Sequence, residues 1–173
     1  CDWSSDVCSS DLLKIHSLVK VAAELWQTYD SQIVEQQSII ETRLKPYKAA
    51  MLQAAEKLAA GVSLAKACSA FMSMPYAELG YLLDGNGRQI GAQVWHPAYT
   101  VDQRGKRFRP MSTIGGARWS RRPYFRHAME HIGEAQATQP YLSISSGHVC
   151  ITVSLAFHQG NERRVICGDI VWE

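Results

Sequence analysis

The chain has 173 residues, of which 46% are hydrophobic, and its 18 basic and 16 acidic side chains give a formal net charge of +2. This length and composition are typical of one globular domain with an accessory helix. No run of about 18 apolar residues occurs, so the sequence predicts no membrane-spanning helix.

Residues 1–12 (CDWSSDVCSSDL) resemble a sequencing adapter translated in one reading frame. Asp2, Asp6 and Asp11 belong to this segment, so without it 13 acidic residues remain against 18 basic ones, for a net charge of +5. We leave the segment out of the fold prediction, as one leaves out a fusion scar. We expect the chain to be a fragment whose upstream part is missing. The alternative is a genuine serine-rich tail with two cysteines.

A long helix is predicted over residues 13–45, where apolar residues recur every three or four positions. The stripe is narrow, which favours pairing between helices over burial of a broad face. Pro46 should kink or restart the helix, because it lacks an amide proton and clashes with the preceding turn. The helix then continues to about Gly61, and Ser63 caps a short helix ending at Met72. The stripe comprises Ile15, Leu18, Ala22, Leu25, Tyr29, Ile33, Ile40 and Leu44.

Two roles fit this N-terminal helix equally well. It can be a dimerising stalk that carries a signal, or it can pack on its own domain. The expected organisation is an adapter-like segment over 1–12, the long helix over 13–60, and a folded domain over 61–173.

After Pro75 the apolar period changes from 3.6 to 2, which predicts strands. Strands 79–83 and 88–95 should form a hairpin around Asn86-Gly87, because both turn positions tolerate a positive φ. Asp84 is interpreted as a turn residue rather than a ligand contact, since Asp bonds its own backbone in turns.

The second half of the chain continues the pattern. A long connection, 96–118, precedes a helix that Ser120 caps and that runs to about Ile132, with Pro123 in its first turn. Strands are then predicted over 140–144, 149–157 and 164–172. The expected fold class is α+β, with a five-stranded antiparallel sheet and helices on one face.

Positive charge is concentrated between His96 and Arg126, where Asp102 is the one acidic residue. Such a stretch indicates a nearby anion, and the alternative is a solvated basic loop. Contact with nucleic acid is a minor alternative, because Phe108 lies among the cations but no nucleic-acid module is recognisable. The basic residues are Arg104, Lys106, Arg107, Arg109, Arg118, Arg121, Arg122 and Arg126.

Beyond residue 12 the cysteines are Cys68, Cys150 and Cys167, with no C-x-x-C spacing. They predict neither a disulfide framework nor a zinc ribbon, and their apolar surroundings are typical of inert buried thiols. Cys150 and Cys167 fall on neighbouring predicted strands, so a bridge between them stays open. Unpaired thiols favour the cytoplasm over the periplasm.

Four short motifs occur in a characteristic order: YLLDGNG at 81–87, WSRRPYF at 119–125, PYLS at 140–143 and GDI at 168–170. Together they resemble the Cache (PAS-like) sensor domains of bacterial signalling proteins, including those attached to cyclic-di-GMP enzymes. The resemblance covers about residues 77–173. It implies a pocket between the sheet and the Arg-containing helix, for a small organic anion or an amino acid.

The resemblance also implies which residues form the pocket. Arg122 offers a planar fork for a carboxylate, and Asp169 would accept an ammonium group. Ser143 stands where amino-acid-binding Cache domains tend to have an acid, so a simple carboxylate is at least as good a candidate as an amino acid. Aromatic side chains would wall the pocket. The expected ligand-binding residues are Trp119, Arg122, Tyr124, Tyr141, Ser143 and Asp169.

Each of these residues also has a purely structural interpretation. Arg122 can pair with Asp169 and hold the helix on the sheet. Tyr124 and Tyr141 can belong to the core, and Trp119 can fix the start of the helix.

One motif suggests different chemistry: HAMEH at 127–131 matches the inverted zinc-peptidase signature H-x-x-E-H. Only 42 residues follow it, and Glu134, Glu162 and Glu173 are poor candidates for the third ligand. A zinc-dependent hydrolase is therefore a minor alternative, and we expect no metal.

The sequence thus predicts a sensory module rather than an enzyme, without a cofactor. It would bind a small anionic ligand and pass a conformational change to an upstream output domain. A homodimer through the N-terminal helix is expected, with no nucleic acid. The alternative is a structural or dimerisation module that binds no ligand.

Overall fold

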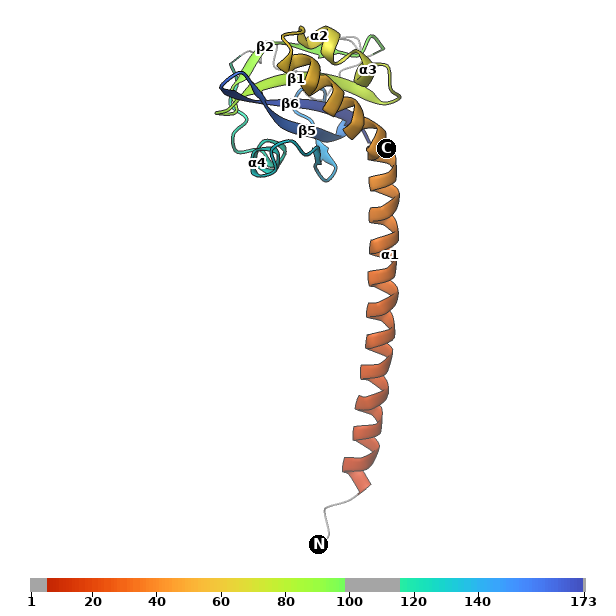
Figure 1. Cartoon of the computed structure of the whole chain (residues 1–173). Helices are drawn as coiled ribbons and strands as arrows, with labels where there is room; N and C mark the ends of the chain where they lie inside the picture. The colour runs from red at the N-terminus through yellow and green to blue at the C-terminus, as the bar shows by residue number, and fades with distance from the viewer. Residues whose placement is uncertain (1–5, 99–115, 173) are drawn as a thin grey trace. The chain divides into compact units, whose positions relative to one another are not determined.

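A computed structural model describes residues 6–98 and 116–172, and the chain divides into two compact units, Cys1–Arg43 and Leu44–Glu173. Helix α1 (Asp6–Ala59) contributes residues to both (Figure 1). No helix of the described residues is long and apolar enough to cross a membrane. The other elements are α2 (Leu64–Ala67), α3 (Ser69–Met72), β1 (Ala77–Asp84), β2 (Gln89–Trp95), α4 (Pro123–Glu130), β3 (Gln136–Ala137), β4 (Tyr141–Leu142), β5 (Val149–Gln159) and β6 (Glu162–Val171).

Helix α1 runs without a break through Pro46, so of the two predicted outcomes the restart is wrong, while the kink stays a prediction. Proline removes one backbone hydrogen bond from the helix. Burial of Leu44, Tyr47 and Met51 on either side supplies apolar packing that offsets this loss. The second compact unit accordingly begins inside the helix, at Leu44.

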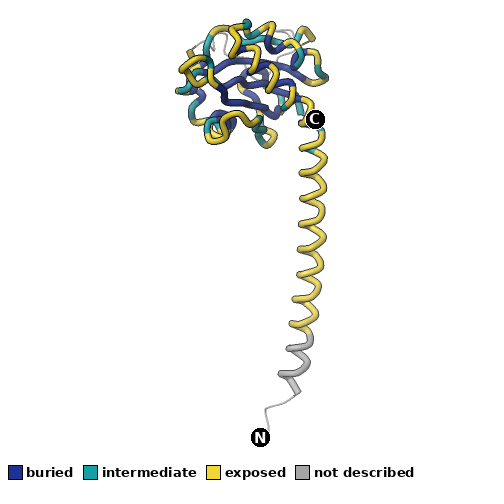
Figure 2. Tube along the Cα trace, viewed as in Figure 1, coloured by how far each residue is buried: buried dark blue, intermediate teal, exposed yellow. Residues whose placement is uncertain are grey.

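The described residues of α1 in the first unit are almost all exposed (Figure 2). The residues of the predicted apolar stripe in this part of the helix therefore lie at the surface. Leu18 and Leu25 are each 66% exposed, and Tyr29 is 55% exposed. These are large apolar side chains that normally find a partner surface.

The short helix predicted to end at Met72 is in fact two helices, α2 and α3, which meet at Cys68. Ser63 occupies the N-cap position of α2 as predicted, but its side chain makes no capping hydrogen bond. The prediction of one capped helix is therefore wrong in its detail.

The six strands form one antiparallel sheet in the order β2-β1-β6-β5-β3, and β4 pairs with β5 off this path. This confirms the predicted α+β class. The extra strand, β3, has two residues, which is too short to produce a period in the sequence. The predicted strand 140–144 is likewise reduced to the two residues of β4.

Helices cover both faces of the sheet, so the expectation that they lie on one face is wrong (Figure 1). Successive residues of a strand point to opposite faces. On β1, Tyr81 meets Tyr124 of α4 edge to face, with ring centroids 6.2 Å apart. Its neighbour Gly80 approaches Cys68 and Met72 on the other face.

Two paired glycines, Gly80 on β1 and Gly168 on β6, bring the short helices close to the sheet. A Cβ atom on Gly168 would lie 2.5 Å from the ring of Phe71, which is fully buried. The ring therefore packs directly on the strand backbone, and the position excludes any larger residue.

Replacing Gly168 with alanine is expected to lower the free energy of unfolding by about 1–3 kcal/mol, because the added methyl group overpacks the Phe71 ring. Urea unfolding measures the change. Adding Phe71→Leu to this variant should remove part of the clash, so the double variant should lose less stability than the two single losses together. Simple additivity would contradict the contact.

The hairpin between β1 and β2 closes around residues 85–87, not around two residues, because the Asp84 amide donates to the Arg88 carbonyl at 2.8 Å. Gly87 has φ +75°, which accounts for glycine there. Asp84 is the turn residue that the sequence predicted: its Oδ1 accepts the amides of Asn86 and Arg88, each at 2.8 Å.

This hairpin loop also positions the start of α4. The Trp119 amide donates to the Gly87 carbonyl at 2.7 Å, and a Cβ on Gly87 would lie 2.6 Å from the Ser120 nitrogen. Ser120 therefore packs against the hairpin and is not the cap: Arg122 takes the N-cap position, and Pro123 begins the helix.

Cys68, Cys150 and Cys167 are free and buried, so the disulfide left open by the sequence is not formed. Burial raises the pKa of the Cys68 thiol to about 11 and raises the pKa of Cys150 and Cys167 as well. All three are protonated at neutral pH, which makes them poor nucleophiles.

Candidate functional site

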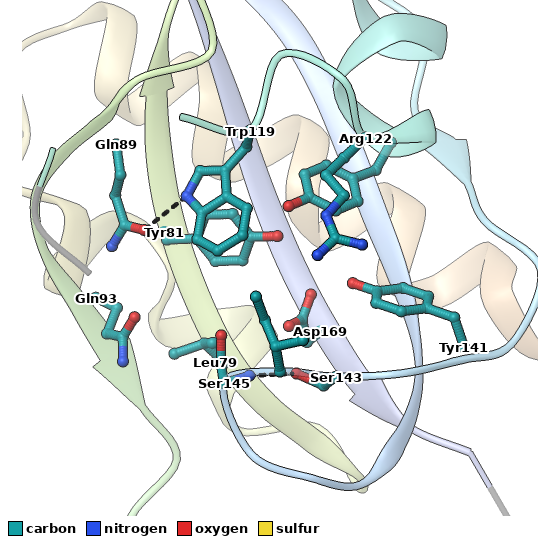
Figure 3. Close-up of a pocket in the computed structure, with 12 residues that line it drawn as sticks. Leu79, Tyr81, Gln89, Gln93, Trp119, Arg122, Tyr141, Ser143, Ser145 and Asp169 are labelled. Carbon is teal, nitrogen blue, oxygen red and sulfur yellow. Dashed lines mark hydrogen bonds between the residues drawn. The ribbon is translucent and has the colours of Figure 1, made fainter. Parts of the chain in front are cut away.

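A small cavity lies between the sheet and the start of α4 (Figure 3). It measures about 20 Å³, room for about one water molecule. All six residues predicted from the sequence line it, so the structure brings the whole predicted set together. The lining residues are Leu79, Tyr81, Gln89, Gln93, Trp119, Arg122, Tyr124, Tyr141, Ser143, Ile144, Ser145 and Asp169.

Arg122 is half-buried, and its guanidinium points toward the space between Tyr141 and Asp169 (Figure 3). Its Cζ atom lies 5.9 Å from the centroid of the Trp119 ring, a distance typical of a cation–π contact. The salt bridges found among the described residues do not join Arg122 to Asp169, so the structural interpretation of this arginine as that ion pair is wrong.

The Trp119 ring is held from its polar edge. Its Nε1–H donates to Oε1 of Gln89 on β2 at 3.1 Å, and both side chains are buried. Gln89 and Gln93 are cavity residues that the sequence reasoning missed. Their spacing of four places them on one face of a strand, which is the signal that could have found them.

Three tyrosines form the aromatic wall. Tyr81 and Tyr124 meet edge to face, and the rings of Tyr124 and Tyr141 stack with centroids 6.5 Å apart. Burial raises the pKa of all three hydroxyl groups, so they stay neutral and act as hydrogen-bond donors or acceptors. Tyr124 and Tyr141 are thus cavity wall and core packing at once.

Asp169 lies at the bottom of the cavity on β6 and is 2% exposed. The Thr152 hydroxyl donates to its Oδ1 at 2.7 Å, and the Tyr141 hydroxyl lies 2.6 Å from the same Thr152 oxygen. Because the single hydroxyl proton of Thr152 is donated to the carboxylate, the Tyr141 hydroxyl must be the donor in its bond with Thr152. Tyr81 lines the same cavity and favours the ionised form of Asp169.

The pKa of Asp169 is raised to about 7: burial is the main cause and the nearby Glu78 carboxylate adds to it, while the hydrogen bond from Thr152 and the effect of Tyr81 oppose the rise. The carboxyl therefore changes charge near neutral pH. In its ionised form it attracts a cation, and in its neutral form it can donate a hydrogen bond to an anion.

The folded domain should hold the Asp169 proton more tightly than the unfolded chain does. Its contribution to stability is then fully present below about pH 4 and is lost as the pH rises to about 7, by at most about 4 kcal/mol. Asp169→Asn accepts the same Thr152 bond but cannot ionise. We expect the free energy of unfolding of this variant, measured in urea from pH 4 to 8, to rise relative to that of the native chain as the pH rises. A difference in free energy that does not change with pH would refute this assignment.

Ser143 begins the loop 143–148, which joins β4 to β5 and lines the cavity with Ser143, Ile144 and Ser145. The Ser143 side chain is 3% exposed, and its oxygen accepts the Ser145 amide at 3.2 Å. It therefore shapes the loop as well as lining the cavity.

A buried ionisable pair lies beside the cavity, and the sequence reasoning missed it. Glu78 on β1 is 1% exposed, and its Oε1 lies 2.6 Å from Nδ1 of His148. The second oxygen, Oε2, is buried and has no hydrogen-bond partner in the described part of the chain. Alternation along a strand gives no signal for it, because an acid in such a pattern is normally solvent-facing.

The zinc-peptidase alternative is not supported. Helix α4 ends at Glu130, so His131 lies beyond it with φ −128° and no longer shares a helix face with His127. Its Nδ1 instead lies 3.1 Å from the His127 carbonyl oxygen. No group of three metal-ligating side chains occurs among residues 6–98 and 116–172.

The predicted basic stretch is described in part. Arg118, Arg121, Arg122 and Arg126 lie in and before α4. The basic residues at 104, 106, 107 and 109, together with Asp102 and Phe108, lie outside the described residues. Of the described arginines, Arg122 lines the cavity, while Arg121 and Arg126 are exposed.

No protein-family model matches the sequence, and no curated protein matches it. Solved structures do resemble the fold. The ligand-binding domain of the Pseudomonas fluorescens chemoreceptor CtaA, in complex with L-isoleucine, matches with 21% identity and a TM-score of 0.50, over 78% of this chain and 51% of that one.

The Bacillus subtilis YkuI protein, which has an EAL domain and was solved with cyclic-di-GMP and calcium, matches with 15% identity and a TM-score of 0.55. The match covers 84% of this chain and 37% of YkuI. The ligand-binding domain of the Pseudomonas aeruginosa amino-acid chemoreceptor PctB, with L-Gln, matches with 17% identity and a TM-score of 0.47, over 79% and 53% of the two chains.

The chain thus spans about half the length of the CtaA domain and less of YkuI. At these identities the likeness establishes the fold. The PAS-like Cache architecture that the sequence motifs predicted is confirmed.

Proposed function

We propose that this Cache-fold domain is a ligand-binding sensory module that takes a small organic anion between Arg122 and the sheet. The observation that carries the proposal is the position of Arg122. Its guanidinium points into a cavity walled by aromatic rings, and no ion pair with Asp169 occupies it. A planar guanidinium beside neutral hydroxyl donors is suited to a carboxylate.

Asp169, at the other end of the cavity from Arg122, bears on the class of ligand. Asp169 has its pKa near 7, so its charge adjusts to the ligand. A simple carboxylate is compatible with the neutral acid, and an amino acid is compatible with the ionised one, which pairs with its ammonium group. The CtaA and PctB domains were solved with amino acids, which makes amino acids the first probes to use here.

Thermal-shift and calorimetric screening of L-amino acids and small carboxylates tests the proposal. Arg122→Ala should weaken any ligand found by about tenfold to a hundredfold, because it removes a charged hydrogen-bond donor. Arg126→Ala is the matched control, since Arg126 is exposed on the same helix, and it should leave affinity unchanged. Equal affinity for the native chain and Arg122→Ala would overturn the assigned pocket.

A matched pair of probes separates the two ligand classes. L-isoleucine and 3-methylpentanoate differ by the amino group alone. If L-isoleucine binds and 3-methylpentanoate does not, the domain is an amino-acid sensor that uses Asp169. If 3-methylpentanoate binds and L-isoleucine does not, it is a carboxylate sensor. A complete lack of specific ligands supports the alternative function, a structural or dimerisation module.

The exposed stripe on α1 supports a second part of the proposal, a homodimer formed through this helix. Ile15, Leu18, Leu25 and Tyr29 follow the three-and-four spacing of a coiled-coil seam, and all are more than half exposed. A second copy of the same stripe is a partner that satisfies this spacing. Such a pair can transmit a ligand-driven shift between two states to an output domain in a longer protein.

Leu18→Glu together with Leu25→Glu should convert the dimer to a monomer, because both charges would lie in the seam. Light scattering after size-exclusion chromatography measures the mass. Gln27→Glu, at an exposed polar position of the same helix, should leave the dimer intact. A native chain that is monomeric at micromolar concentration would refute the stalk while leaving the ligand pocket untouched.

A further inference from the structure

The loop 143–148 forms one wall of the cavity and is built as a compact unit. The Ser143 amide donates to the His148 carbonyl at 2.8 Å, and the Gly147 amide donates to the Ser143 carbonyl at 2.8 Å. The flanking strand β4 has two residues and pairs with Val149 and Cys150 of β5. The loop is therefore bonded internally and is attached to the sheet on this side by a strand of only two residues.

Some part of the cavity wall must move for a ligand to enter. The cavity holds about 20 Å³, enough for about one water molecule, and any amino acid or organic acid is several times larger. The strands β1 and β6 are buried in the sheet and cannot yield without breaking their ladders. The loop is partly at the surface: Ser143, Ser145 and Ser146 are buried, whereas Ile144 is 43% exposed.

A side-chain bond ties the end of this loop to the sheet. Glu78 precedes Leu79, a cavity residue, and its Oε1 lies 2.6 Å from Nδ1 of His148. The histidine side chain is 30% exposed and the glutamate side chain 1% exposed. The bond therefore joins the core of the domain to the end of the loop.

We propose that the Glu78–His148 bond is a latch that holds loop 143–148 over the cavity, and that its release admits the ligand. The proposal rests on the proposed function, because it takes the cavity as the ligand site. Glu78 and His148 are positioning residues in this account: they act on the ligand through the loop.

The surroundings of Glu78 explain why the closed position of the loop is favoured. Its Oε2 is buried without a partner in the described residues, so His148 provides the carboxylate with its hydrogen bond. Opening the loop leaves a buried acid with neither oxygen bonded, which is costly. Glu78 also acts electrostatically on Asp169 and Cys150, which places the latch next to the acidic end of the cavity.

Cys150 provides a direct readout of opening. The thiol is fully buried, and Cys150 pairs across the sheet with Tyr141 of β4, shortly before the loop. Cys68 and Cys167 are equally buried elsewhere in the domain. Loop opening should expose Cys150 alone, whereas global unfolding exposes all three thiols.

The experiment is site-resolved alkylation of the full chain with iodoacetamide, read by peptide mass spectrometry. His148→Ala should raise the labelling rate of Cys150 by about tenfold to a hundredfold, the range for losing one hydrogen bond to a charged group. Cys68 and Cys167 should keep their native rates. His148→Asn, whose amide can donate in place of Nδ1, should restore slow labelling.

Glu78→Gln is the second variant, because it removes the charge while keeping the size of the buried side chain. It should raise Cys150 labelling by a smaller factor, since the amide oxygen still accepts a weaker bond. An unchanged Cys150 rate in His148→Ala, or a rise shared equally by all three thiols, would overturn the latch. Neither result bears on Arg122→Ala, so failure of the latch and failure of the ligand pocket are distinguishable.

Discussion

Strand β6 lies between β1 and β5 and is buried on both faces, and this constraint organises the domain. Adjacent residues of a strand point to opposite faces of the sheet, so neighbouring positions contact different parts of the domain. Gly168 faces Phe71 and lets the short helices pack on the backbone. Asp169, the next residue, faces the cavity. The helical layer and the ligand pocket are thereby joined through one strand.

Placing a carboxyl group in the middle of a sheet is costly unless its oxygens are hydrogen-bonded. In this domain the hydrogen bonds from Tyr141 to Thr152 and from Thr152 to Asp169 offset this cost. The same bonds fix the aromatic wall of the cavity. The polar network therefore stabilises the fold and sets the chemistry of the site, and a pKa near 7 for Asp169 is the result of burial only partly offset by these bonds.

Most of the fold was predictable, because the apolar period changed visibly from helix to strand after Pro75. The errors have physical causes. Strand β3 is too short to show a period, and Pro46 is tolerated because buried neighbours such as Leu44 stabilise the helix around it. The cap was assigned to Ser120 from residue preference alone. In the structure Ser120 packs against Gly87, a contact between distant segments that no local pattern records.

The sequence by itself determined the α+β class and the turn at Asp84, because the patterns that carry them are local. The resemblance of its short motifs to Cache domains pointed to six residues that line one cavity in the structure. The tertiary structure decided which face each helix covers and which further side chains join the pocket. Gln89, Glu78 and His148 are separated from the motifs along the chain or hidden by an ordinary strand pattern. Their roles arise from strand pairing, which brings together residues that the sequence keeps apart.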